Sequence, residues 1–250
     1  HLAIREVLFT GGDPFTVDNA TLERLLDGIA SIPSVERIRI GSRTLVTMPM
    51  RVTDELVSLL QQYEKPGQRE VAVVTHVEHP YEITPELVEA AHRLRHGGIP
   101  VYNQLVYTFY VSRRFEASLL RRLLRLAGID PYYTFATKGK EETSAYRVPL
   151  PRLLQEVQEE ARLLPGLART DEPVYNVPGL GKNHVRALQH RDLVAIRPNG
   201  ARVYEFHPWE KNIVKQGTYV GDDIPILDYL ERLRRIGENP ADYETIWYYF

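Results

Sequence analysis

Short apolar stretches alternate along the chain with segments whose apolar positions recur every three or four residues. Stretches of the first kind predict strands, and five of them occur, at 6–10, 37–40, 71–75, 100–107 and 132–135. Each is followed by an amphipathic helical pattern. This order is typical of βαβ units and therefore predicts a parallel sheet.

Local end signals support the same elements. Helices are expected to begin near Asp18 or Asn19, at Thr53 and at Thr84-Pro85, where proline suits the first helical position. A long amphipathic helix is expected at 150–164, and a hairpin at 194–206 turning at 198–200. The sequence thus predicts an α/β fold, a partial (β/α)6 barrel at 1–170 with a β-hairpin extension at 171–250.

Composition narrows the class of protein. The 250 residues carry a net charge of -2, which argues against nucleic acid as a partner because such binding needs a clustered basic excess. The longest apolar runs fall short of the roughly 18–20 residues that cross a membrane. The chain has no cysteine, which fits a reducing compartment, and we expect a cytoplasmic protein. It begins at His1 and runs almost directly into a strand, so we expect the natural chain to start upstream.

In α/β barrels the chemistry lies on the loops that follow the strands. Those loops direct attention to Gly11 to Asp13, Ser42-Arg43, His76 to His79, Gln104 and Lys138, and to the loop at 176–182.

Six stretches in a consistent order resemble the lysine 2,3-aminomutase family of radical S-adenosylmethionine (SAM) enzymes, and most closely its glutamate 2,3-aminomutase branch. They lie at 8–13, 39–53, 75–80, 98–104, 131–133 and 177–182. The resemblance implies a radical-SAM barrel that lacks its first βα unit. The CxxxCxxC cysteines that hold a [4Fe–4S] cluster would lie upstream of His1, so no metal ligand is expected within this chain.

The resemblance also assigns a SAM site. Gly11, Gly12 and Asp13 match the turn that receives the amino group of SAM, and Ser42, His76 and Gln104 match positions of the same site. Two glycines allow a close approach of the backbone, and a carboxylate offsets a cation. The plainer interpretation of Gly11 to Asp13 is an ordinary β-turn.

Histidines offer a second interpretation. His76 and His79 could form a metal pair, but no third ligand stands out. His92 and His96 share a helix face near its C-terminus, where a solvated surface role suits an imidazolium.

Lys182 matches the family lysine that holds pyridoxal phosphate (PLP) as a Schiff base. A lysine flanked by glycine can reach a cofactor aldehyde and later move away. Leu180 stands where the family has a glycine, so Lys182 could instead be a surface lysine.

Two positions predict the substrate. Lysine-specific members of the family place two aspartates, with a charge of -2, where this chain has Lys138 and Asn176, which together carry +1. A charge pair at 4 Å is worth about 4 kcal/mol at an effective dielectric of about 20, so the exchange favours a side-chain carboxylate over lysine. Alternatively, Lys138 is one charge in a solvated loop.

The resemblance therefore implies a 2,3-aminomutase, an isomerase that moves an amino group from C2 to C3, with PLP, SAM and a [4Fe–4S] cluster as cofactors. The expected reaction converts L-glutamate to 3-aminoglutarate, with an external electron donor and a homo-oligomer as further expectations. A lysine 2,3-aminomutase and a non-catalytic relative that binds cofactors remain as alternatives. We expect these 250 residues alone to be inactive.

Overall fold

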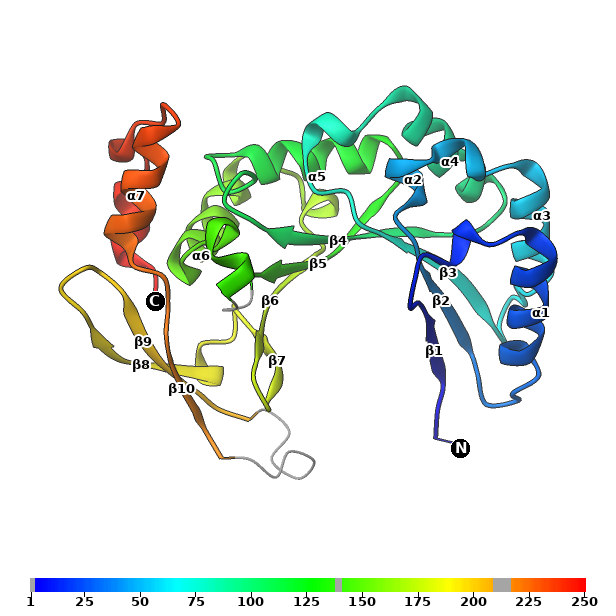
Figure 1. Cartoon of the computed structure of the whole chain (residues 1–250), viewed down its shortest axis with the longest axis horizontal. Coiled ribbons are helices and arrows are strands. Elements are labelled where there is room, and N and C mark those ends of the chain that lie inside the picture. The colour runs from blue at the N-terminus through cyan, green and yellow to red at the C-terminus, as the bar shows by residue number, and fades with distance from the viewer. Residues whose placement is uncertain (1–2, 138–140, 209–216) are drawn as a thin grey trace. The chain divides into compact units, whose positions relative to one another are not determined.

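The computed structural model describes residues 3–137, 141–208 and 217–250, which form an α/β protein (Figure 1). Seven strands follow one another in the order β1-β2-β3-β4-β5-β6-β7, and three more form an antiparallel sheet in the order β10-β9-β8. Parallel pairing joins β1 to β4 in sequence and also joins β5 to β6, whereas β7 runs antiparallel to β6. The predicted partial α/β barrel with a C-terminal β extension is confirmed.

The chain divides into two units, 1–104 with 121–132 and 105–120 with 133–250. The first unit alternates strands with helices. Its elements, three of which continue into the second unit, are β1 (Glu6–Phe9), α1 (Asn19–Ala30), β2 (Arg37–Gly41), α2 (Thr44–Thr47), α3 (Asp54–Gln61), β3 (Glu70–Thr75), α4 (Pro85–His96), β4 (Val101–Tyr107), α5 (Glu116–Leu126) and β5 (Asp130–Ala136).

Side-chain caps fix the starts of three helices in this unit. Asp18 accepts a hydrogen bond from the Thr21 N–H at 2.7 Å and caps α1. Thr53 and Thr84 cap α3 and α4 in the same way. Each cap satisfies an N–H that the helix itself cannot pair, worth about 1 kcal/mol, and all three predicted helix starts are confirmed.

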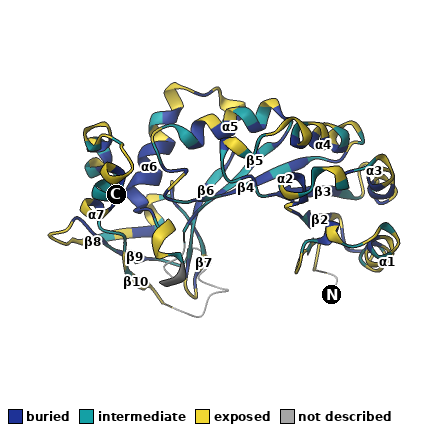
Figure 2. Ribbon diagram, turned by 45° about the horizontal axis from the view of Figure 1, so that its top comes forward, coloured by how far each residue is buried: buried dark blue, intermediate teal, exposed yellow. Residues whose placement is uncertain are grey.

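The two faces of the parallel strands differ in character. Helices α1, α3 and α4 lie on one face of β1 to β3 (Figure 1), and their inward side chains are buried (Figure 2). Ile38 and Ile40 of β2 are fully buried on that face. The alternate positions of β2 carry Arg37, which pairs with Glu70 at 2.5 Å, and Arg39, which pairs with Glu6 at 2.8 Å. The face without helices therefore carries paired charges at the amino ends of these strands and apolar residues, among them Leu8 and Val74, further along.

The second unit contains α6 (Leu150–Glu159), β6 (Glu172–Val177), β7 (Gly181–His184), β8 (Arg191–Ile196), β9 (Arg202–Phe206), β10 (Tyr219–Asp222) and α7 (Ile226–Arg235). Strands β8 and β9 are the predicted hairpin, and Gly200 in its turn has a φ of +80° that favours glycine. The prediction of one helix over 150–164 was too long. The α-helix ends at Glu159 and continues as a 3-10 turn, Glu160–Arg162, a common form for the last turn of a helix. Pro165 lacks an N–H and disfavours the helical conformation at Leu164, so the helical pattern stops before it.

The aromatic C-terminal segment packs within its own unit. Tyr243 and Ile246 are fully buried. The ring of Trp247 lies so close to Gly200 that a Cβ there would be 2.7 Å from it. In the described part of the chain, no helix has both the length and the apolar character to span a membrane.

Asp223 follows β10 and joins it to α6, because its Oδ2 accepts a hydrogen bond from the Leu150 N–H at 2.7 Å. Burial raises the pKa of the Asp223 carboxyl to about 7, against the opposing effects of the Ile224 and Leu150 N–H groups and of the charges on Arg147 and Arg202. Between the unfolded pKa of 3.8 and the folded value, the folded state holds more protons than the unfolded state. The free energy of unfolding should therefore fall as pH rises through this range.

An Asp223→Asn variant keeps an oxygen that can accept the Leu150 N–H but removes the titration. Between about pH 5 and about pH 8, its Tm should decrease less than that of the unmodified chain. Thermal unfolding followed by circular dichroism measures this, with the exposed Asp228→Asn on α7 as the control. Parallel profiles for all three proteins would contradict a raised pKa of the Asp223 carboxyl.

Candidate functional site

The loop after β1 contains the first predicted motif. Gly11 has a φ of +136°, a conformation that side chains disfavour. A Cβ added to Gly11 or Gly12 would meet no atom of the described residues within 4 Å. The glycine backbone therefore borders open space and can be approached closely.

The carboxylate of Asp13 ties this loop to the end of β2. Its Oδ1 accepts hydrogen bonds from the Phe15 N–H at 3.0 Å and the Ser42 hydroxyl at 2.7 Å. Its Oδ2 accepts one from the Arg43 N–H at 2.6 Å. Both oxygens are thus engaged within the protein, and Asp13 fixes the turn that precedes it.

Five of the six residues predicted to bind SAM line one pocket at the carboxyl ends of β1 to β4. These are Gly12, Asp13, Ser42, His76 and Gln104, and Gly11 is next to them in the chain. The pocket lies within the first unit, where the parallel register brings these strand ends together.

Thr75 also lines this pocket and was not predicted. Its side chain is 1% exposed, and its hydroxyl makes no hydrogen bond in the described structure. A buried hydroxyl without a partner is costly, and it suits a polar ligand that would satisfy it. Thr75 begins the stretch 75–80 that carries the resemblance, but threonine is common in strands and its residue type did not single it out as a ligand contact.

The histidines at the end of β3 form hydrogen bonds instead of a metal cluster. His76 Nε2 lies 2.6 Å from Glu78 Oε2, and His79 Nδ1 accepts the Tyr81 N–H at 3.2 Å. Among the described residues, no group of three side chains is arranged to hold a metal ion. His92 and His96 are exposed on α4 and stack on each other, with ring centroids 5.4 Å apart.

Arg43 and Asn103 hold the surrounding loops. The Arg43 guanidinium donates to the His76 carbonyl at 3.1 Å and pairs with Glu82 at 2.7 Å. Asn103 is buried, and its amide accepts the Val77 N–H and donates to the Val77 carbonyl. The loop after β3 is therefore fixed from both sides.

The second unit carries the predicted lysine on a hairpin. Strands β6 and β7 pair so that Asn176 lies directly opposite Lys182. Cross-strand partners share a face of the sheet. The structure therefore brings together two residues that the sequence predicted separately, whereas Lys138 lies outside the described residues.

Two aromatic rings of β5 lie next to the Lys182 amine. Its Nζ lies 4.0 Å from the ring centroid of Tyr133 and 5.9 Å from that of Phe135. The side chain is partly exposed, and no carboxylate among the described residues pairs with it. A cation over ring faces gains about 0.5–1 kcal/mol at exposed sites, which positions the amine without neutralising its charge.

Leu180 anchors the loop that precedes Lys182. It is 5% exposed, and it is flanked by Gly179 and Gly181, whose φ values are +73° and +77°. The glycines make the tight turn and the leucine fixes it in the core, so its presence does not carry Lys182 away from the aromatic face. Beyond Lys182 on the same face, His184 lies near Glu172, with Nδ1 and Oε1 3.5 Å apart.

Fold and site together define an α/β-barrel segment with a polar pocket at its strand ends and an accessible lysine on a hairpin. No model of a known protein family matches the chain. The chain is 54% identical over 250 residues to an uncharacterized KamA family protein of Methanocaldococcus jannaschii. The matched region is 100% of this chain and 40% of that protein.

Two further relatives have named activities. Glutamate 2,3-aminomutase of Clostridioides difficile is 32% identical over 226 residues, which are 90% of this chain and 50% of that protein. L-lysine 2,3-aminomutase of Methanococcus maripaludis is 34% identical over 184 residues, which are 71% of this chain and 40% of that protein. Among solved structures, SuiB of Streptococcus suis bound to S-adenosylmethionine is 12% identical with a TM-score of 0.46, over 69% of this chain and 39% of that one.

The resemblance to the lysine 2,3-aminomutase family is therefore confirmed, and the chain is a relative of KamA-family proteins along its whole length. It spans 40% to 50% of the length of these relatives.

Replacing Asp13 tests the link between the ends of β1 and β2. Asp13→Ala removes three hydrogen bonds and leaves the Ser42 hydroxyl and the Arg43 N–H without this acceptor. We expect the free energy of unfolding to drop by about 1–3 kcal/mol, as measured by urea unfolding. Asp228→Ala on the exposed face of α7 should change the free energy of unfolding by less than about 0.5 kcal/mol. An equal effect of both variants would show that Asp13 does not stabilise the link between the ends of β1 and β2.

Proposed function

We propose that this chain is part of a PLP-dependent radical-SAM 2,3-aminomutase that moves the amino group of L-glutamate from C2 to C3. The observation that carries the proposal is the position of Lys182. Its amine lies over the Tyr133 ring, without a carboxylate partner in the described structure, and opposite Asn176.

The residues around Lys182 fit PLP. A partly exposed amine can reach an aldehyde, and the rings of Tyr133 and Phe135 offer flat surfaces on which a planar cofactor ring can pack. An amine already paired with a carboxylate would lose that partner on reacting, and among residues 3–137, 141–208 and 217–250 Lys182 has no such pair to break.

The strand-end pocket fits SAM. The open backbone at Gly12 and the unsatisfied Thr75 hydroxyl offer hydrogen-bonding groups to a polar ligand. Gln104 and His76 add two polar side chains to the same pocket. These residues cannot hold an iron–sulfur cluster through thiolates, because the chain has no cysteine. A [4Fe–4S] cluster would need ligands from outside these residues.

The residues of this chain would hold the cofactors in position and keep water away from them. When bound, PLP would supply an aldehyde and a conjugated ring that stabilises an unpaired electron, and SAM would supply a hydrogen-abstracting group when a reduced [4Fe–4S] cluster, held by ligands outside these residues, provides an electron. Lys182 would hold and then release the cofactor through its Nζ, while Tyr133 and Phe135 keep water from that face. Asp13 would hold the glycine turn in place through its bonds to Ser42 and Arg43. The net reaction is an isomerisation in which the C2 amino group and a C3 hydrogen exchange places, so no atom is gained or lost.

The position of Asn176 supports glutamate as the substrate. It lies beside Lys182 and is uncharged, where lysine-specific relatives are expected to carry an aspartate. Without that carboxylate, the site offers less attraction to a distal ammonium and less repulsion to a distal carboxylate. The glutamate 2,3-aminomutase match also extends over 90% of this chain, compared with 71% for the lysine enzyme.

Capture of PLP tests the role of Lys182 directly. The chain incubated with PLP and reduced with borohydride should gain one cofactor mass at Lys182, located by peptide mass spectrometry. Lys182→Ala should lose this adduct, whereas Lys65→Ala in the first unit should keep it. Labelling spread equally over several lysines would end the proposal for a dedicated cofactor lysine.

Substrate choice is tested with the full-length gene product, because the chain matches only part of its relatives. Glutamate should be converted and lysine should not. Asn176→Asp should lower kcat/KM for glutamate by about tenfold or more, since a carboxylate near the substrate's own carboxylate costs at least about 1.4 kcal/mol. Turnover of lysine alone would favour the lysine-type enzyme, and loss of all turnover with intact PLP capture would point to a non-catalytic relative.

A further inference from the structure

A second pocket lies entirely within the second unit and shares no residue with the candidate site. It is formed by β6, β9, β10 and the segments next to α6. The residues that matter for its chemistry are Arg147, Tyr175, Phe206, Tyr219, Gly221 and Asp223.

Stacked aromatic rings form one wall of this pocket. Tyr175 lies parallel to Phe206, with 8° between the planes and 5.2 Å between ring centroids. Tyr219 lies 6.4 Å from the same phenylalanine. Phe206 is buried behind them, at 3% exposure, while Tyr219 is 36% exposed. Of the three rings, the two tyrosines are therefore the more exposed to a ligand.

Gly221 allows Tyr219 to take this position. A Cβ on Gly221 would lie 2.8 Å from Cε1 of the Tyr219 ring, closer than real side chains come. The ring thus folds over the glycine two residues further along β10. Any larger residue at 221 would displace the ring from the wall.

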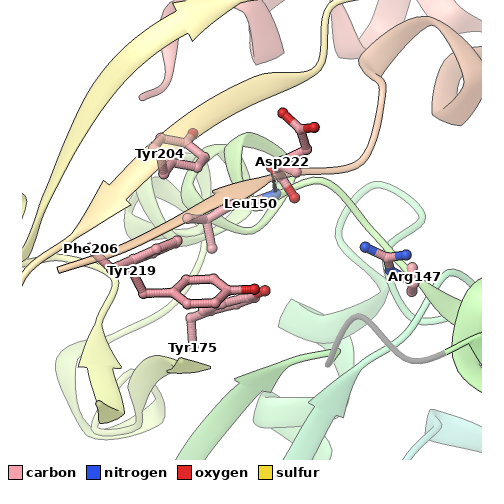
Figure 3. Close-up of a pocket in the computed structure, with 9 residues that line it drawn as sticks. Arg147, Leu150, Tyr175, Tyr204, Phe206, Tyr219 and Asp222 are labelled. Atoms are coloured by element: carbon pink, nitrogen blue, oxygen red, sulfur yellow. Dashed lines mark hydrogen bonds between the residues drawn. The ribbon is translucent and has the colours of Figure 1, made fainter. Parts of the chain in front are cut away.

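The side chain of Arg147 lies on the side of the pocket to which the tyrosine hydroxyl groups point. Figure 3 shows the hydroxyl groups of Tyr175 and Tyr219 pointing toward the side on which Arg147 lies. The Arg147 guanidinium makes no hydrogen bond or ion pair within the part of the chain that the structure describes. Its charge does act across the pocket, because it opposes the rise that burial and the Asp223 carboxylate cause in the pKa of Tyr175.

The nearby carboxylates are already occupied. Asp223 accepts the Leu150 N–H at 2.7 Å, a bond drawn in Figure 3. Asp222 pairs with Arg197 through two bonds of 2.9 and 3.0 Å. In the described part of the chain no ion pair joins either carboxylate to Arg147, although the charges of Arg147 and Asp223 act on each other, so the guanidinium remains available beside the aromatic wall.

We propose that this pocket binds a small anion that carries a planar ring. The ring would pack against Tyr175 and Tyr219, since offset stacking is the arrangement that aromatic faces prefer. The anionic group, a carboxylate or a phosphate, would pair with Arg147, whose planar guanidinium matches both. An ammonium ligand is disfavoured because the same guanidinium repels it.

Calorimetric titration of the chain with benzoate and, separately, with adenosine monophosphate tests this chemistry and distinguishes an aromatic acid from a mononucleotide. At least one should bind with a defined stoichiometry. Arg147→Met should weaken that binding by about tenfold or more, the loss expected for a charge-assisted pair. Arg234→Met on α7, which removes an exposed arginine that pairs with Glu231 and does not line the pocket, should leave the affinity within about twofold.

Two further variants locate the binding. Tyr219→Ala removes the exposed ring and should also weaken binding, whereas Lys182→Ala should not alter it, which separates this pocket from the proposed cofactor site. Thermal unfolding of each variant controls for misfolding. The proposal is overturned if neither probe binds at millimolar concentration, or if Arg147→Met binds as tightly as Arg234→Met.

Discussion

The antiparallel pairing of β6 with β7 is the constraint on which the proposed chemistry depends. It places Asn176 opposite Lys182 and directs both to the face that carries Tyr133 and Phe135. A slip of one residue in this register would turn the lysine to the other face of the sheet. The two positive-φ glycines and the buried Leu180 fix the turn and therefore the register.

A comparable constraint orders the first unit. Parallel strands end at one edge of the sheet, so loops separated by about thirty residues meet there. The Asp13 carboxylate joins two of these loops by accepting hydrogen bonds from Ser42 and Arg43, 29 and 30 residues away. Arg43 then reaches the next loop through the His76 carbonyl. The pocket is thus shaped by a chain of side-chain-to-backbone bonds that begins at the motif after β1.

The features that could be predicted from the sequence are those determined by residues close together in the chain. The caps at Asp18, Thr53 and Thr84 are local, and the periodicity of the strands in the first unit is plain, so these elements were found. Strands β6 and β7 were missed, because Pro173 and the turn residues 178–181 interrupt the pattern and pairing between strands leaves no local signal. The motifs pointed to candidate residues that the structure brings into one pocket, but the sequence did not reveal that Asn176 lies opposite Lys182 or that Asp13 links two loops.

The second pocket was not predicted from the sequence, because its residues are far apart in the chain. Its aromatic wall comes from β6, β9 and β10, which are distant in the chain, and Arg147 precedes a helix that Asp223 caps from 73 residues away. No pattern of spacing joins such residues. Their chemistry becomes visible only once the strands are placed side by side.

A crystal structure of the chain grown with PLP would test the central claim most directly. The account predicts continuous electron density from Nζ of Lys182 to the cofactor, with the cofactor ring against Tyr133 and Phe135. Density on another lysine, or a Lys182 that points away from this aromatic face while PLP is bound elsewhere, would contradict it.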